Sequence, residues 1–143
     1  MSQFTIRTGR WDELQNDAKL IREQVFIQEQ QIPVEDEWDA EDAISVHFVV
    51  YDQDQPIATA RLLQNNSVGR VAVLKSHRGA GIGKLLMQQI IQQAKHQQRE
   101  FLKLSSQVHA IQFYAGLGFN VEGEQYLDCG IPHIDMRLLF TRS

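Results

Sequence analysis

The sequence has few of the residues that crosslink, anchor or export a chain. Cys129 is the only cysteine among 143 residues, which excludes an internal disulfide and a cysteine-rich zinc site. No apolar run approaches the ~20 residues that a membrane helix requires, and the first residues lack the basic flank and apolar core of a signal peptide. We therefore expect a cytoplasmic protein that has no membrane partner.

An excess of basic charge is missing as well. Lys and Arg together number 14, against 18 for Asp and Glu, so the net charge is -4 with neutral histidines. A surface that binds nucleic acid needs clustered Lys and Arg, and for this reason nucleic acid is not an expected partner. Hydrophobic residues make up 43% and charged residues 22%, which is ordinary for a soluble globular protein. We interpret residues 1–143 as a single domain.

A glycine-rich stretch between a strand and a helix is the most informative feature present. Residues 71–74 form an apolar, β-branched run typical of a buried strand, and apolar residues then recur at helical spacing from Ile82 onward. Between them lies R-G-A-G-I-G, from Arg78 to Gly83. Glycines at a helix start let an anion approach the free backbone N–H groups, and Arg78 and Lys84 add positive charge.

The spacing of the glycines separates three kinds of phosphate-binding loop. The dinucleotide fingerprint fails because the third glycine, Gly83, comes one residue too early. The nucleotide P-loop fails because its first glycine falls on Arg78 and its Ser or Thr falls on Leu85. The remaining pattern, R-x-x-G-x-G, resembles the acetyl-coenzyme A loop of the GCN5-related N-acetyltransferase (GNAT) family. A turn that merely closes the corner between strand and helix is the structural alternative.

A second segment, residues 107–119, resembles the A-x-x-F-Y-x-x-L-G-F block of the same family. In that family a tyrosine of this block faces the sulfur of the coenzyme, and the match assigns this role to Tyr114. Its hydroxyl could then donate a proton or a hydrogen bond to the leaving thiolate. A tyrosine in a short helix can equally serve as core packing.

The resemblance implies acetyl-CoA as co-substrate, no metal, and the GNAT acyl-CoA N-acyltransferase fold. That fold is α/β, with a mixed and mostly antiparallel sheet flanked by helices on both faces. A backbone N–H of residues 72–74 could hold the carbonyl oxygen during the reaction. The residues expected to contact the coenzyme are Ala72, Val73, Leu74, Arg78, Gly79, Ala80, Gly81, Ile82, Gly83, Lys84 and Tyr114.

An amine similar to lysine has a pKa near ~10, so it must lose a proton before it can attack a thioester. Histidine is suited to this task at neutral pH. His133 lies in G-I-P-H-I-D-M, which resembles a segment of small-molecule acetyltransferases similar to glyphosate N-acetyltransferase, where the histidine is the base. The match assigns that role to His133, with His47 or a water path as alternatives. We interpret His77, His96 and His109 as structural or solvent-facing.

The same resemblance points to Arg22 and Arg70 as contacts to an anionic acceptor, although both could be surface charges. A third basic position falls on Gln107, which disfavours an acceptor with two negative charges. Glu29 and His47 complete the predicted acceptor-binding set. Glu29 belongs to the run E-Q-Q-I-P-V-E, which resembles small bacterial acyltransferases similar to ElaA and YjcF over nearly the whole chain.

An acidic stretch surrounds Trp38 in residues 34–42. It favours either a solvated loop anchored by the tryptophan or the lining of a pocket that attracts a cationic amine. The sequence does not decide between these two interpretations.

The remaining pattern predicts the order of elements along the chain. A strand at the N-terminus precedes a helix that begins near Trp11, and residues 44–51 and 57–63 are expected to pair as a hairpin. After them we expect a turn at Asn65, Asn66 and Gly69, strand 71–74, the helix from Ile82, strand 100–106, helix 108–117, a strand starting at 119–121 and a last strand at 134–140. A helix joins strands 71–74 and 100–106, so we predict that they run parallel through a right-handed crossover.

The function that these observations predict is acetyl transfer from acetyl-CoA to the primary amine of a small molecule, by direct attack on the thioester. Two alternatives stay open: a protein or peptide N-acetyltransferase, and a non-catalytic acyl-CoA-binding module. The chain is expected to act as a monomer or a homodimer.

Overall fold

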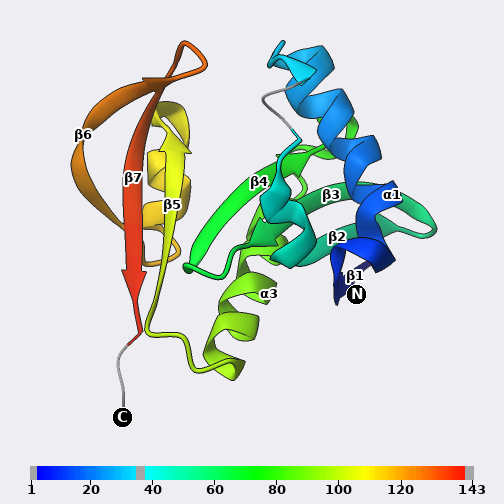
Figure 1. The fold of residues 1–143 in the computed structure, drawn as a ribbon, viewed down its shortest axis with the longest axis horizontal. Helices are drawn as coiled ribbons and strands as arrows, with labels where there is room; N and C mark the ends of the chain where they lie inside the picture. Colours follow the sequence, from blue (N-terminus) through cyan, green and yellow to red (C-terminus); the bar gives the residue numbers. More distant parts are fainter. Residues whose placement is uncertain (1–2, 35–37, 141–143) are drawn as a thin grey trace.

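A computed structural model describes residues 3–34 and 38–140 of the chain. Its framework is one seven-stranded sheet with the strand order β1-β2-β3-β4-β5-β7-β6 (Figure 1). The strands are β1 (Phe4–Gly9), β2 (Val46–Asp52), β3 (Gln55–Leu62), β4 (Ser67–Val73), β5 (Phe101–Gln107), β6 (Asn120–Asp128) and β7 (Ile131–Leu139). Only β4 and β5 pair in parallel, so the predicted mixed and mostly antiparallel sheet is confirmed.

The helices lie along the chain between these strands. They are α1 (Trp11–Arg22), the π-helix η1 (Glu23–Glu29), the 3-10 helices η2 (Ala40–Ile44), η3 (Lys75–His77) and η4 (Val108–Ala110), and the α-helices α3 (Ile82–His96) and α4 (Ile111–Ala115). In the part of the chain that the structure describes, no helix is long and apolar enough to cross a membrane.

Burial along the central strands shows that both faces of the sheet are covered. Side chains alternate between the two faces of a strand, yet 47–51 in β2 and 57–62 in β3 are buried without interruption. Helices α1 and α3 both pack against β2, β3 and β4. The buried face of α1 includes Leu14, Ala18 and Ile21, and that of α3 includes Leu86 and Ile90, at the spacing that the amphipathic pattern predicts.

The first helix does not keep α-helical geometry to its end. Beyond Arg22 it widens into η1, where the N–H of Gln30 donates to the carbonyl of Val25 at 3.0 Å, a five-residue step. Such π-turns are rare and frequently lie at functional sites. The sequence predicted a helix from near Trp11 without this change of geometry, because an apolar pattern does not distinguish the two helix types.

Strand β4 departs from the prediction in its start and in how little of it pairs with β5. It begins at Ser67, and Gly69 pairs with Arg61 of β3 rather than forming a turn. β4 runs parallel to β5, as predicted, but the pairing involves only Ser67 with Lys103 and Val68 with Leu104, so residues 71–73 have no partner on β5.

A β-bulge lies where β4 leaves β5. Gly69 is paired with Arg61 and Ala72 with Thr59, so Arg70 and Val71 together face the single residue between those partners. Arg70 has a φ of +53°, an unusual value for a side chain that is not glycine. A bulge bends its strand, and beyond this one β4 and β5 diverge (Figure 1).

The last hairpin is longer than predicted. β6 runs from Asn120 to Asp128, although the sequence predicted only its beginning, and β7 starts at Ile131 rather than near residue 134. Every residue of β6 is exposed, so no alternation of polar and apolar side chains marks it. Gly123 has a φ of +81° and lies at an irregularity in the pairing of β6 with β7. A glycine inside such a segment is typical of a turn, and for this reason the sequence did not predict that the strand continues past it.

Candidate active site

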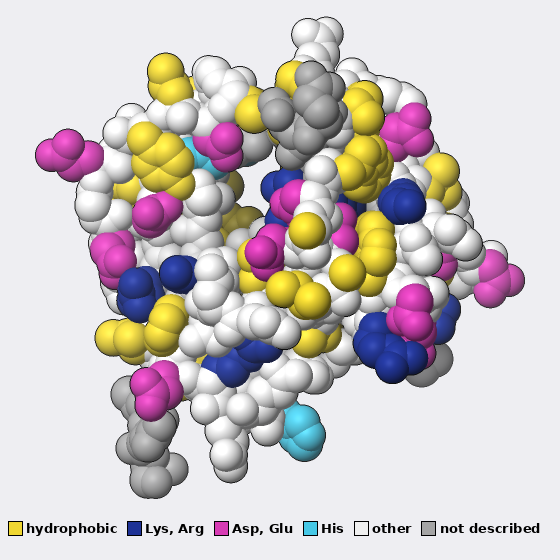
Figure 2. Space-filling view, viewed as in Figure 1, with side chains coloured by type: hydrophobic (Ala, Val, Ile, Leu, Met, Phe, Trp, Pro, Cys, Tyr) yellow, Lys and Arg dark blue, Asp and Glu magenta, His cyan; other side chains and the backbone are white. Residues whose placement is uncertain are grey.

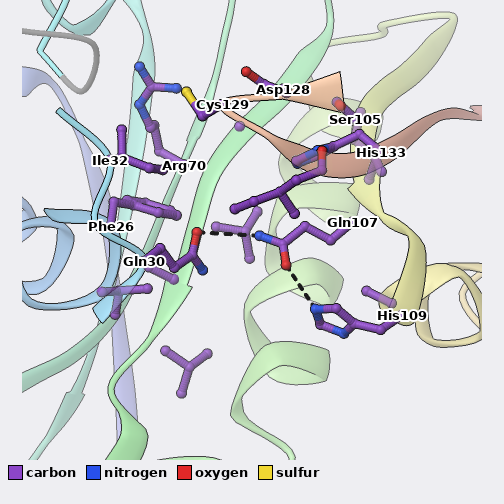
Figure 3. Close-up of a pocket in the computed structure, with 18 of the residues that line it drawn as sticks. Phe26, Gln30, Ile32, Arg70, Ser105, Gln107, His109, Asp128, Cys129 and His133 are labelled. Atoms are coloured by element: carbon purple, nitrogen blue, oxygen red, sulfur yellow. Dashed lines mark hydrogen bonds between the residues drawn. The ribbon is translucent and has the colours of Figure 1, made fainter. Parts of the chain in front are cut away.

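The divergence of β4 and β5 opens a cavity of about 830 Å³. The space-filling view shows the molecule hollowed between the half that carries β1 to β4 and the half that carries β5 to β7 (Figure 2). Residues of η1, β4, β5, β7 and the short helix α4 line this cavity. In the close-up, Phe26, Gln30 and Ile32 lie on one side of it, and Gln107 and His133 lie on the other (Figure 3).

One wall of the cavity is the free edge of β4. The N–H of Leu74 donates to the carbonyl of Ile57 at 2.9 Å, so alternation along the strand turns the backbone groups of Val71 and Val73 away from β3. The carbonyl of Val73 accepts a hydrogen bond from Nε of Arg78 at 3.0 Å. An unpaired strand edge can bind an extended ligand as an additional strand.

Of the predicted coenzyme contacts on this strand, Ala72 and Val73 line the cavity. Leu74 does not, and its backbone is already engaged because its carbonyl also accepts from the N–H of His77 at 2.9 Å. The prediction named a backbone N–H of residues 72–74, and the N–H of Leu74 is therefore excluded from that set. The backbone of Val73 is better placed for that purpose.

The glycine-rich loop leads from β4 into α3. Gly79 and Gly81 have φ values of +85° and +78°, and a Cβ added to either would meet no atom within 4 Å. Glycine is thus required by the backbone conformation rather than by crowding in this structure. Gly83 differs, because a Cβ there would lie 3.4 Å from Cζ of Phe113.

Gly81 is the N-cap of α3, and it has no side chain with which to cap the helix. The first N–H groups of a helix lack intrahelical acceptors, so those of Ile82, Gly83 and Lys84 are available to a ligand. This 15-residue helix also presents its positive end here. The helix start that the glycine spacing predicted is thus present, while contacts of a coenzyme with Gly79, Ala80, Gly81, Ile82, Gly83 and Lys84 stay a prediction.

Arg78 contacts a residue that the sequence assigned to the other substrate. Its Nη1 donates to Oε2 of Glu29 at 2.6 Å, and its Nη2 donates to Oε1 at 2.7 Å. These hydrogen bonds lower the pKa of Glu29 and raise that of Arg78. Both residues line the cavity, so the ion pair connects η1 to the start of the glycine loop.

His133 is held in a fixed orientation on β7. The structure pairs it with Gln107 of β5 on one side and Tyr126 of β6 on the other, and its side chain lines the cavity. Its Nδ1 lies 2.7 Å from the carbonyl oxygen of Ile131. A carbonyl only accepts hydrogen bonds, so Nδ1 carries a hydrogen and Nε2 of the neutral ring is left as an acceptor. The ring also stacks on Tyr126, with centroids 6.2 Å apart.

Tyr114 lies in α4 and lines the cavity. Its ring packs edge-on against Phe113 and Phe119, at centroid distances of 5.0 and 6.0 Å. Burial raises the pKa of its hydroxyl to about 12, so the phenol stays protonated at neutral pH. Tyr114 and His133 were both predicted as catalytic, and the structure places both on the lining of one cavity.

A row of polar side chains crosses the cavity (Figure 3). Nε2 of Gln107 donates to Oε1 of Gln30 at 3.4 Å, and Nε2 of His109 donates to Oε1 of Gln107 at 2.8 Å. Gln107 was predicted as an acceptor contact and lines the cavity, whereas His109 was interpreted as structural or solvent-facing and also lines it. Sequence reasoning missed Gln30 because it follows a π-turn that no pattern revealed.

Two predicted acceptor contacts lie away from the cavity. Arg22 is only 1% exposed, and its Nη1 and Nη2 donate to the carboxylate of Asp42 at 2.8 and 3.2 Å. His47 is buried, donates from Nε2 to the carbonyl of Asp42 at 2.8 Å, and has its pKa lowered by that burial. The structure brings Arg70 and Glu29 to the cavity, but not Arg22 or His47.

Where the structure describes it, the acidic stretch lines a second, smaller cavity of about 480 Å³, which Trp38, Asp39 and Asp42 share with Trp11, Lys19 and Glu23. Attraction of a cationic amine to it stays a prediction. Asp42 is 3% exposed and joins Arg22 to Arg61, while Asp39 pairs with Arg61 at 2.7 Å and with Arg70 at 3.3 Å. Asp42 is thus a buried partner of arginine and Asp39 an exposed one, and neither lines the main cavity. Residues 35–37, which carry the rest of the acidic charge, lie outside the described residues.

No metal centre is visible in residues 3–34 and 38–140. No three His, Cys, Asp or Glu side chains in these ranges are grouped so as to hold an ion.

The site thus combines a splayed pair of parallel strands, a free strand edge and an uncapped helix start. The chain belongs to the GNAT acetyltransferase family, whose domain it matches over residues 16–140. It is 38% identical to the uncharacterized N-acetyltransferase YjcF of Bacillus subtilis over 129 residues, or 87% of this chain and 92% of YjcF. The protein is accordingly an acyltransferase enzyme.

Solved structures agree with this assignment. Escherichia coli ElaA superimposes with a TM-score of 0.86 at 28% identity, covering 94% of this chain and 99% of ElaA. An acyl-CoA N-acyltransferase from Pseudomonas aeruginosa gives the same TM-score at 29% identity, covering 94% of this chain and 99% of its own. The predicted GNAT fold is thereby confirmed.

Proposed function

We propose that this enzyme transfers the acetyl group of acetyl-CoA to the primary amine of a small molecule by direct attack on the thioester. The observation that carries the proposal is the presence of His133 and Tyr114 on one cavity, beside the free edge of β4. A base and a hydrogen-bond donor on the same cavity are what attack by an amine and departure of a thiolate require.

The loop and β4 supply what binding of the coenzyme needs. The uncapped start of α3, with Gly79 and Gly81 opening the backbone, supports binding of the pyrophosphate. The free edge of β4 supports binding of the amide-containing arm as an extra strand. By alternation, the N–H of Val73 faces the same edge and can donate to the oxygen on which charge develops.

His133 is proposed as the base that takes the proton of the acceptor. The Ile131 carbonyl fixes the tautomer, so the acceptor atom is Nε2. Stacking against Tyr126 and the backbone contact together limit rotation of the ring. A fixed acceptor atom lowers the entropy cost of proton transfer at the moment of attack.

Tyr114 is proposed to stabilise the leaving thiolate by a hydrogen bond rather than by giving up its proton. Its pKa is raised to about 12, whereas a thiol ionises near ~8.5, so the thiolate is the weaker base. Each pKa unit corresponds to about 1.4 kcal/mol, which places complete transfer roughly 5 kcal/mol uphill. A hydrogen bond to an ionised sulfur avoids that cost and still favours departure.

The dimensions of the cavity favour a small acceptor over a peptide. About 830 Å³ is within the range of sites that bind small molecules and cofactors. The hydrogen bond between Gln30 and Gln107 spans the space between η1 and β5, where a peptide groove would have to remain open.

The test is a screen of primary amines, amino acids and peptides with acetyl-CoA, scored by release of coenzyme A and by mass spectrometry of the product. Turnover of small amines is expected, and Tyr114→Phe and His133→Ala should reduce it. A blank without amine corrects for reaction of the exposed Cys129 with the thiol reagent. Acetylation of peptides alone would favour the protein acetyltransferase, and coenzyme binding without any turnover would favour the non-catalytic module.

A further inference from the structure

One ion pair joins Arg78, a predicted contact of the coenzyme, to Glu29, a predicted contact of the acceptor. Arg78 begins the loop proposed to bind the coenzyme, and Glu29 ends η1, which lines the cavity beside it. The carboxylate and the guanidinium are joined by two hydrogen bonds of 2.6 and 2.7 Å, with both side chains 39% exposed.

The pair occupies the part of Arg78 that a phosphate would use. A guanidinium binds carboxylates and phosphates in the same way, through two parallel N–H groups. In this structure Nη1 and Nη2 are both directed to Glu29, and Nε is directed to the carbonyl of Val73. The carboxylate of Glu29 is therefore an internal substitute for an anionic ligand.

A pyrophosphate bound at the start of α3 would lie next to this carboxylate. Two anions close together repel each other, and the pyrophosphate carries the larger charge. Besides Arg78, the cation that acts on Glu29 is Lys75 of η3, through a longer-range attraction. Exchange of Arg78 from carboxylate to phosphate would thus relieve the repulsion and leave Glu29 without its main partner.

We propose that binding of the coenzyme moves Arg78 from Glu29 to a phosphate, and that the released Glu29 carboxylate then binds the ammonium group of the acceptor. This inference rests on the proposed function and adds to it an order of binding and a class of acceptor. The acceptor is a cationic primary amine, and its site is completed only when the coenzyme is bound. Glu29 is a specificity residue, distinct from the base His133.

The cavity offers one alternative anion against which this assignment can be tested. Within the described chain, Glu29 and Asp128 are the two carboxylates on its lining. Glu29 is held by Arg78, whereas Asp128 belongs to the last residues of β6. Only Glu29 therefore links the acceptor site to occupancy of the coenzyme site.

Carbon-13 NMR of the glutamate side chains tests the exchange without any catalysis. The Glu29 signal, assigned by its absence in Glu29→Gln, is titrated with and without desulfo-coenzyme A, which cannot carry an acetyl group. In the free protein Arg78 lowers the pKa of Glu29, so release should raise this pKa when the coenzyme binds. An unchanged titration would show that the pair persists and would overturn the proposal.

Calorimetry with desulfo-coenzyme A tests the competition. Exposed ion pairs are worth about 0.2–1 kcal/mol, so Glu29→Gln should bind up to about fivefold more tightly. Glu122→Gln is the matched control, because Glu122 forms a similar bidentate and exposed pair with Arg137 outside the cavity. Weaker binding in Glu29→Gln would show that Glu29 positions Arg78, contrary to the proposal. If the parent shows no binding, the proposed function itself fails.

The acceptor half is tested with n-butylamine as the probe, by NMR titration of the labelled protein. Addition of n-butylamine should change the chemical shifts of the protein when desulfo-coenzyme A is present. These changes should be lost in Glu29→Gln and persist in Asp128→Asn. Equal binding with and without the coenzyme analogue, or no binding to the loaded parent, would overturn the assignment. Loss of binding in Asp128→Asn alone would move the ammonium site to Asp128.

Discussion

Replacing Asp42 of η2 with asparagine should show how much its buried ion pairs contribute to the free energy of unfolding. This carboxylate accepts hydrogen bonds from both Nη atoms of Arg22 and from Nη1 of Arg61 at 2.8 Å. The two arginines and Asp42 are all no more than 5% exposed. Asparagine has nearly the same shape, but it leaves two buried guanidinium groups without their shared negative charge.

The expected loss follows from this burial. Removing one partner of a buried ion pair typically costs about 3–5 kcal/mol, because the remaining charge stays out of water. For a chain of this size each kcal/mol lowers Tm by roughly 3 °C, so Asp42→Asn should lower Tm by about 10–15 °C. Glu122→Gln breaks an exposed pair and should cost less than about 1 kcal/mol.

Urea unfolding followed by circular dichroism measures both variants against the parent. A double-mutant cycle of Asp42→Asn with Arg22→Gln isolates the coupling between the two residues. If Asp42→Asn destabilises the protein no more than Glu122→Gln does, or if the cycle shows no coupling, the reasoning from burial is refuted.

The remaining predictions concern catalysis, the coenzyme and acid stability. Tyr114→Phe should lower kcat by roughly 10²-fold while leaving coenzyme affinity in calorimetry nearly intact; equal turnover with chemistry rate-limiting would reduce Tyr114 to packing. His133→Ala should remove the dependence of kcat/KM on a basic group and slow strongly basic amines more than weakly basic ones; an unchanged pH profile would exclude it as the base. Gly81→Asp should abolish coenzyme binding, because it places a negative charge at the start of α3, and calorimetry with normal affinity would contradict this. Arg61 lowers the pKa of Asp39 to about 2, so the stability from this carboxylate is present above the unfolded value near ~3.9 and is lost as the pH falls toward 2; an acid titration in which Asp39→Asn loses stability in parallel with the parent would contradict it.

The sequence was most informative where local chemistry determines the structure. The glycines before Ile82 predicted an uncapped helix start, and the structure places Gly79 and Gly81 at positive φ there. Tyr114 and His133 could be predicted as catalytic because each lies in a short motif that resembles a family, and their roles stay a prediction. Both residues line the cavity that separates β4 from β5.

The rest depends on contacts between distant parts of the chain. Arg22 resembles a surface charge in sequence, and its burial is explained only by Asp42, twenty residues away. The bulge at Arg70 contains no glycine at the residue with positive φ, so no turn signal reveals it. His109 lines the cavity because β5 and β4 diverge, which follows from pairing that a linear pattern does not contain.

The π-helical segment η1 determines how the cavity responds to a change of chain length. Its wide turns contain more residues than α-helical turns would over the same span. Deleting one residue between Glu23 and Val25 would remove a surplus residue, so that ordinary α-helical pairing could span the same distance and leave the direction of Glu29 and Gln30 unchanged. A deletion within α1, which has no surplus residue, would instead turn every later residue by about 100° around the axis and move Glu29 and Gln30 off the cavity. The cavity should therefore tolerate a shorter η1 better than a shorter α1.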